Sequence, residues 1–151
     1  MLTLILIGMF SLMFNIQPVK GDESFGIQRD GSIYPPTGKM VTFDNVVYTL
    51  TADITFDPDV YDAIEVERDN IVIDGAGYTL HGSGADVGIL LSSRHNVTIQ
   101  NVNIKNFGVG ISIVSYSYHN IISGNNITDN EYIGIGITNS FNNTISGNNV
   151  T

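Results

Sequence analysis

The stretch Ser123-Gly124-Asn125-Asn126-Ile127-Thr128 returns later in the chain as Ser146-Gly147-Asn148-Asn149-Val150-Thr151. Isoleucines outside this stretch keep the same spacing, since Ile99, Ile122 and Ile145 are evenly placed at the interval that separates the two copies. A fixed period of about 23 residues is typical of repeat proteins, in which each unit packs only against its neighbours. The sequence therefore predicts coils of this length that stack along one axis.

The repeat includes other parts of each unit. A second apolar series has the same period: Ile104, Ile127 and Val150. A glycine–isoleucine segment recurs at an interval one position longer: Gly110-Ile111-Ser112-Ile113 and Gly134-Ile135-Gly136-Ile137. Within each unit the two isoleucine positions are five residues apart, and one coil earlier Ile73 and Tyr78 have the same separation. We therefore expect Ile73 and Tyr78 to occupy these two positions, and Gly88–Leu91 to correspond to the glycine–isoleucine segment.

Each unit contains three short apolar stretches separated by glycine or asparagine. Such strands bury little surface alone, but stacked at about 4.8 Å on similar neighbours they form continuous parallel sheets around a dry interior. The predicted fold is all-β, a right-handed single-stranded parallel β-helix, because crossovers between parallel strands are nearly always right-handed. A β-rich N-terminal cap is expected, since an open solenoid end exposes unpaired strand edges.

The chain divides into three predicted parts. Residues 1–21 are interpreted as a signal peptide, 22–68 as a capping segment, and 69–151 as β-helix coils. Turn signals at Asp30-Gly31 and Pro35–Gly38 interrupt the capping segment. The last coil stops directly after Thr151, so we expect a truncated chain. The downstream coils of its own full-length chain would then pack on the last coil.

The N-terminal segment has the features of a targeting signal. Met1 to Ile16 is almost wholly apolar, uncharged, and shorter than the roughly 20 residues of a membrane span. Val19 and Gly21 match a signal-peptidase site, which places the mature start at Asp22. We therefore expect an exported protein that is extracellular, on the cell surface or periplasmic, without a stable membrane span in the mature chain. An uncleaved anchor is the alternative.

Composition limits the partners. Six basic and 15 acidic residues give a net charge of −9, which repels nucleic acid phosphates and anionic membrane surfaces. The chain has no cysteine, so disulfides, thiolate metal sites and cysteine nucleophiles are excluded. Apolar residues make up 42% of the chain, which is sufficient for a packed core.

The repeat places asparagines at recurring positions. Asn125 and Asn148 occupy one coil position and are expected to form an inner structural ladder, in which each side chain bonds the adjacent coil. Repeats rich in asparagine and threonine also create Asn-X-Thr sequons by chance. Four such sequons are candidates for glycosylation in an exported chain: Asn96, Asn126, Asn142 and Asn149.

His95 and His119 are the candidate ligands for copper or zinc. Their separation exceeds the period by one position, so the register places His119 over Asn96, and only a one-residue bulge would bring the imidazoles together. The alternative is that both are solvated loop residues. Asp129 and Glu131 are candidate calcium ligands. The sequence predicts no resident cofactor apart from these two options, copper and calcium.

No catalytic residue is assigned. Polysaccharide-cleaving β-helices use clustered Asp or Glu, with calcium and basic residues in lyases or paired acids in hydrolases. The predicted coils carry scattered acids, such as Asp74 in a turn, and no paired-aspartate motif on a strand. The chain as given is therefore expected not to be a complete enzyme, and an active site beyond Thr151 is the alternative.

Three segments resemble the parallel β-helix repeats of NosD-type proteins: Asn96–Asn101, Ile122–Ile127 and Ile145–Val150. Ile71–Tyr78 is similar to the first coil of pectate-lyase-like β-helices, and 22–69 resembles the leading segments of archaeal exported members. The resemblance implies the fold. It implies no single function, because such proteins include copper-chaperoning periplasmic proteins, carbohydrate-active enzymes and surface proteins.

Tyr116, Tyr118 and Tyr132 fall in loops between predicted strands, where exposed rings can stack on sugars or pack the loops. The leading hypothesis is a secreted or cell-surface module that binds a polysaccharide or cell-envelope glycan, or forms an envelope scaffold. One alternative is the N-terminal part of a polysaccharide-acting lyase, hydrolase or epimerase. Another is NosD-like periplasmic copper delivery.

Overall fold

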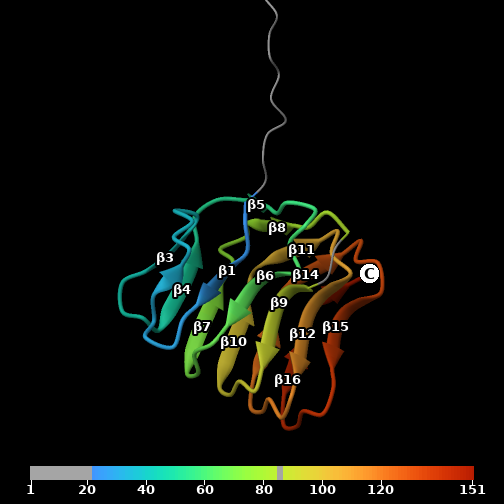
Figure 1. Ribbon diagram of the computed structural model, residues 1–151. Coiled ribbons are helices and arrows are strands. Elements are labelled where there is room, and N and C mark those ends of the chain that lie inside the picture. The colour runs from blue at the N-terminus through green and yellow to red at the C-terminus, as the bar shows by residue number, and fades with distance from the viewer. Residues whose placement is uncertain (1–21, 85–86) are drawn as a thin grey trace, which may run out of the picture.

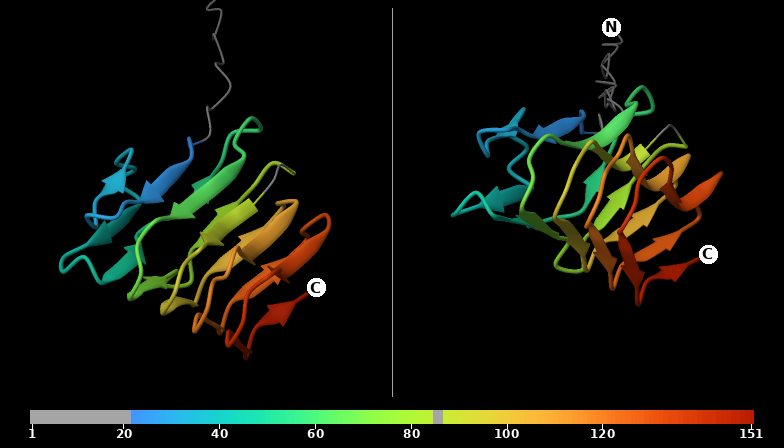
Figure 2. Two further views of the ribbon diagram at one scale, coloured as in Figure 1. Left: turned by 60° about the horizontal axis from the view of Figure 1, so that its bottom comes forward. Right: turned by 90° about the horizontal axis from the view of Figure 1, so that it is seen from below.

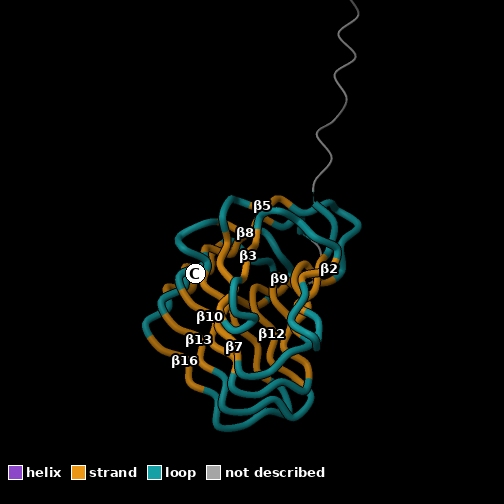
Figure 3. Tube along the Cα trace, turned by 90° about the vertical axis from the view of Figure 1, so that its left-hand side faces the viewer, coloured by secondary structure: helices purple, strands orange, loops and turns teal. Residues whose placement is uncertain are grey.

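The computed structural model describes residues 22–84 and 87–151, and within these ranges the chain forms strands and no helix (Figure 3). The predicted signal peptide, residues 1–21, lies outside the described residues. The strands wind into a β-solenoid of about four turns (Figure 1). The predicted parallel β-helix is therefore confirmed.

Three sheets run along the solenoid axis, and we name them the first, second and third sheet (Figure 2). In spatial order, the first sheet contains β2 (Ile33–Tyr34), β1 (Phe25–Ile27), β6 (Asp62–Val66), β9 (Val87–Ser92), β12 (Val109–Val114) and β15 (Ile133–Ile137). The second sheet contains β3 (Met40–Thr42), β4 (Val47–Leu50), β7 (Ile71–Asp74), β10 (Val97–Gln100), β13 (Ile121–Ser123) and β16 (Thr144–Ser146). The third sheet contains β5 (Ile54–Thr55), β8 (Thr79–His81), β11 (Asn103–Lys105), β14 (Asn126–Thr128) and β17 (Asn149–Val150).

The interior columns follow the sequence period. Three columns of paired residues fill the space between the sheets: Ile73–Ile99–Ile122–Ile145, Leu80–Ile104–Ile127–Val150 and Ile64–Ile89–Ile111–Ile135. Ile122 and Ile127 are completely buried. Ile145 and Val150 of the last coil are 40% and 47% exposed, because no described coil covers them on one side.

The assignment of Tyr78 to an interior position is wrong. Leu80 pairs with Ile104 and is buried, whereas Tyr78 lies in the preceding turn and is 37% exposed. The turn between β7 and β8 is longer than the corresponding turn between β10 and β11 in the next coil. Ala76 and Gly77 in this longer turn have positive φ angles, 49° and 83°. The turn absorbs the insertion, so the strands keep their register.

The N-terminal part combines two modes of pairing. β1 pairs antiparallel with β2, and β3 pairs antiparallel with β4. The strands β4, β5 and β6 already pair in parallel with β7, β8 and β9, so coil geometry begins within the segment that the sequence assigns to the cap. β1 joins the first sheet beside β6, where Gly26 pairs with Glu65.

Polar side chains at the corners bind each coil to the preceding one. The Asn125 side chain accepts a hydrogen bond from the Val102 N–H at 3.1 Å and donates one to the Ile99 carbonyl at 3.0 Å. The same pair of bonds, to a backbone N–H and a backbone carbonyl of the preceding coil, recurs at other corners: Ser117, Asn120, Asn143 and Asn148. Every buried side-chain polar atom in the described part of the chain has a partner.

A packing prediction follows at Gly110, which lies on β12 against the third-sheet interior column. A Cβ atom at Gly110 would lie 2.6 Å from the Gly134 carbonyl oxygen and 2.7 Å from Cγ2 of Ile127. Gly110→Ala is therefore expected to lower the free energy of unfolding by about 1–3 kcal/mol, measured by urea denaturation. Gly136→Ala is the control, because its Cβ would meet nothing closer than 3.6 Å and should change stability by less than about 0.5 kcal/mol. Equal losses in both variants would contradict this packing.

Candidate functional site

The structure separates the two histidines that the sequence proposes as metal ligands. Tyr118 lies over His95 on the next coil, with ring centroids 5.0 Å apart and planes 3° from parallel. His119 contacts the edge of the Tyr118 ring at a centroid distance of 5.2 Å. The bulge that would align the imidazoles does not form, because His119 takes the same corner conformation as Asn96 and Asn142, with φ angles of 56°, 55° and 54°.

His95 and Tyr118 belong to an aromatic column at the turn between the first and second sheets. Asp69 holds His95 from below, with its Oδ2 3.2 Å from Nδ1 and its Oδ1 accepting the His95 backbone N–H at 2.9 Å. Phe141 stacks on the other face of Tyr118 at 5.4 Å. Both faces of the Tyr118 ring are therefore covered, so this tyrosine is not available to stack on a sugar.

The described residues do not fit a copper centre. Copper in proteins is held by convergent imidazole, thiolate or thioether groups. In residues 22–84 and 87–151, no group of three or more His, Cys, Asp or Glu residues lies close enough to hold a metal ion. Met40 is buried in the core of the cap, and His81 lies against the Asn106 side chain at 2.6 Å.

Asp129 and Glu131 line one hollow of about 490 Å³ beside the third sheet, together with His81, Asn106 and Phe107. Asp129 has a structural role there, because it is a corner residue with a φ of 55° whose carbonyl accepts the Asn106 N–H. A calcium site at these two acids stays a prediction.

Tyr116 and Tyr132 do not form one platform. Both are strongly exposed, at 75% and 72%. Tyr116 follows β12, whereas the Tyr132 N–H donates to the carbonyl of Gly108, which precedes β12. The strand of 6 residues between them spans about 20 Å, so the two rings lie near opposite ends of the strands of the first sheet.

All four sequon asparagines are exposed: Asn96, Asn126, Asn142 and Asn149. All four use their side-chain amides: Asn96 donates to Asn70 at 2.9 Å, Asn149 donates to Asn126 at 2.7 Å, and the Asn142 Nδ2 lies 3.4 Å from His119 Nε2. The surface position is compatible with glycosylation, whose occupancy stays a prediction.

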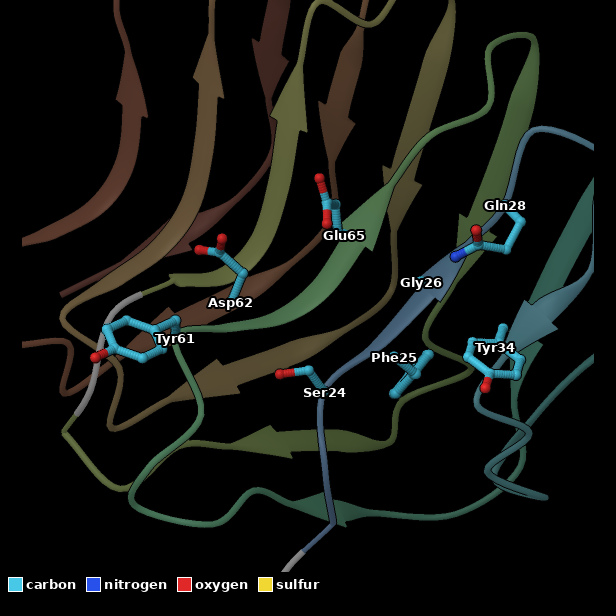
Figure 4. A pocket seen from close by; sticks show the side chains of 8 residues that line it. All are labelled: Ser24, Phe25, Gly26, Gln28, Tyr34, Tyr61, Asp62 and Glu65. Atoms are coloured by element: carbon cyan, nitrogen blue, oxygen red, sulfur yellow. The ribbon is translucent and has the colours of Figure 1, made fainter.

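A different set of side chains surrounds a hollow of about 320 Å³ on the first sheet at the cap end (Figure 4). Tyr34 and Tyr61 lie on opposite sides of it and are 68% and 78% exposed. Ser24, Asp62 and Glu65 lie between the two rings. The volume falls within the range of about 300–1,000 Å³ that is usual for ligand pockets.

Gly26 lies at the floor of this hollow, under the side chain of Gln28. Phe25 and Ile27 are buried in the core, so strand alternation turns the position of Gly26 outward. A Cβ atom at Gly26 would lie 2.7 Å from Nε2 of Gln28 and 3.3 Å from the Glu65 carbonyl oxygen. Any larger residue would displace the Gln28 amide, which offers a hydrogen-bond donor and an acceptor at the edge of the hollow.

Two further hollows share Tyr34 with the first, and we call the three together the cap-end groove. One, of about 660 Å³, includes Glu23, Asp57 and Asp59 in its lining together with Tyr61. The other, of about 410 Å³, includes Arg29, Asp30 and Glu67. Hydrogen bonds from the backbone N–H and the hydroxyl of Ser32 lower the pKa of Asp30.

Sequence reasoning missed the cap-end groove because its parts come from the irregular segment. Tyr34 and Tyr61 are distant in the chain and lie outside the repeat. The only local signal is that each tyrosine stands in a turn-rich, acidic context, next to Pro35 and Asp62 respectively. The pairing of β1 with β6 brings the two turns together, and the chain forms β2 to β5 between these partners.

The comparisons with known proteins agree with the architecture. No helix in the described ranges is both long and apolar enough to cross a membrane. Neither a curated protein nor a solved structure matches the chain. The family described as periplasmic copper-binding protein (NosD) matches residues 23–151, which include every described strand. The chain therefore belongs to the NosD family.

Proposed function

We propose that this chain is an exported β-helical module that binds carbohydrate in the cap-end groove. The observation that carries the proposal is the position of Tyr34 and Tyr61, two exposed rings on opposite sides of one hollow. A tyrosine ring has an apolar face and a polar tip, which matches the C–H face and the hydroxyl rim of a sugar ring. The periplasmic description of the family supports export.

The scaffold under the groove is a pair of strands over the buried core. β1 and β6 pair along the whole of β1, and the side chains below them belong to the core, with Phe25, Ile27 and Ile64 at most 2% exposed. A binding site on paired strands holds its side chains more closely than one on loops alone. Ser24 and Gln28 supply hydroxyl and amide groups for the hydroxyls of a bound sugar.

The family description favours a second candidate function, copper binding in the periplasm. His95 and His119 are the residues that this function would require from the coils. His95 stacks on the face of the Tyr118 ring and His119 contacts its edge, and the described part of the chain offers no three-ligand group. Carbohydrate binding is therefore the function that this geometry supports better.

A glycan array followed by titration tests the carbohydrate site. Tyr34→Ala and Tyr61→Ala should each weaken binding about tenfold, which corresponds to the loss of about 1.4 kcal/mol of ring contact. Tyr116→Ala is the matched control, because this tyrosine is similarly exposed and lines none of the three hollows of the cap-end groove. Failure to bind any glycan, or equal weakening by Tyr116→Ala, would reject the proposal. Release of reducing ends would favour an enzyme instead.

Calorimetric titration with copper tests the second candidate. We expect no tight stoichiometric copper site that depends on His95 and His119, since the two rings do not converge. The double variant His95→Ala plus His119→Ala should therefore bind copper as the native chain does. A saturable one-to-one site that either single substitution abolishes would show that the aromatic column rearranges to hold the metal. Copper delivery would then take precedence over carbohydrate binding.

A further inference from the structure

We infer that the cap-end groove selects saccharides that carry a free amino group, an inference that rests on the proposed carbohydrate binding. Its basis is the combination, in one hollow, of exposed tyrosine rings with carboxylates. Asp62 and Glu65 on β6 lie between Tyr34 and Tyr61 in Figure 4. Uncharged sugars need the rings and hydroxyl partners, and they gain nothing from a negative potential.

Acidic side chains outnumber basic ones in the groove, where Arg68 and Arg94 donate to backbone carbonyls of the lining residues Arg29 and Glu67. Carboxylates line all three of its hollows: Asp62 and Glu65 in the first, Glu23, Asp57 and Asp59 in the second, Asp30 and Glu67 in the third. Of the described residues that line the groove, Arg29 is the one base. A cleft lined by one sign of charge concentrates ligands of the opposite sign and repels uronic acids and phosphate-bearing glycans.

Tyrosine and carboxylate recognise an ammonium group in complementary ways. A cation is attracted to the face of an aromatic ring within about 6 Å of its centre. A carboxylate accepts charge-assisted hydrogen bonds from the same ammonium group, and these are stronger than bonds between neutral partners. Glu65 is exposed and lines the hollow, so its carboxylate is accessible to a ligand there.

One outward-facing column of the first sheet carries its charge at the cap end. Glu65 begins an outward-facing column whose later members, one per coil, are Leu90, Ser112 and Gly136. These later positions carry no charge, so a glycan chain lying along this column would meet a carboxylate at Glu65 and none at the later positions. The selective contact is therefore expected at one or two sugar units of a longer chain.

Titration with two oligosaccharides of equal length tests the inference: glucosamine oligomers and their fully N-acetylated counterparts. The two differ in the charged amine and share the sugar ring, and the measurement is made below the pKa of the amine. The native exported chain should bind the amine form about tenfold more tightly, which is the contribution of one charge-assisted contact. Added salt should reduce this preference.

Substitutions then identify the carboxylate. Glu65→Gln keeps the shape of the side chain and should weaken binding of the amine form about tenfold, while the acetylated form binds as before. Glu131→Gln is the control, since Glu131 is an exposed acid that lines a different hollow. Equal affinity for both oligomers, or equal weakening of both by Glu65→Gln, would overturn the amine selectivity.

The same experiment separates this inference from the proposed function. Equal binding of both oligomers that still depends on Tyr61 would leave carbohydrate binding intact and reject only the selectivity. Tighter binding of an oligogalacturonate than of the glucosamine oligomer would also reject it, because that ligand carries the opposite charge. Absence of binding by every oligosaccharide would reject both.

Discussion

The fold depends on the hydrogen bonds that corner asparagines make between successive coils. Each amide accepts a backbone N–H and donates to a backbone carbonyl of the preceding coil, as Asn125 does with Val102 and Ile99. An unpaired buried N–H would cost about 1–3 kcal/mol. The bonds form only when adjacent coils have the same length at that corner, so they impose the period that the interior isoleucines share.

The corners leave the outward-facing positions free to differ, and the proposed function uses this freedom. Within the coils the outer column of the first sheet is uncharged, from Leu90 to Gly136. At the cap end the addition of β1 and β2 places Gly26 beside Glu65 of β6, and Tyr34 beside Gly26. The regular solenoid thus provides the support, and the irregular end provides the chemistry.

The repeat made most of the fold predictable, because each coil copies the contacts of its neighbour. The stacking of Ile99, Ile122 and Ile145 follows directly from their spacing. The spacing does not identify interior residues where a coil differs in length, since the internal gap that points to Tyr78 does not hold in a coil with a longer turn. Tyr34 and Tyr61 could not be paired from sequence, because no period relates two positions in the irregular segment.

Amide chemical-shift changes on adding the glucosamine oligomer to the isotopically labelled chain test the central claim most directly. The account predicts that the largest changes map to the cap-end groove, on residues 24–34 and 61–65, and that the coil tyrosines Tyr116 and Tyr132 stay unaffected. Changes centred on Tyr116, Tyr132 or the hollow at Asp129 would place binding elsewhere. Such a result would contradict the assignment of function to the cap end of the solenoid.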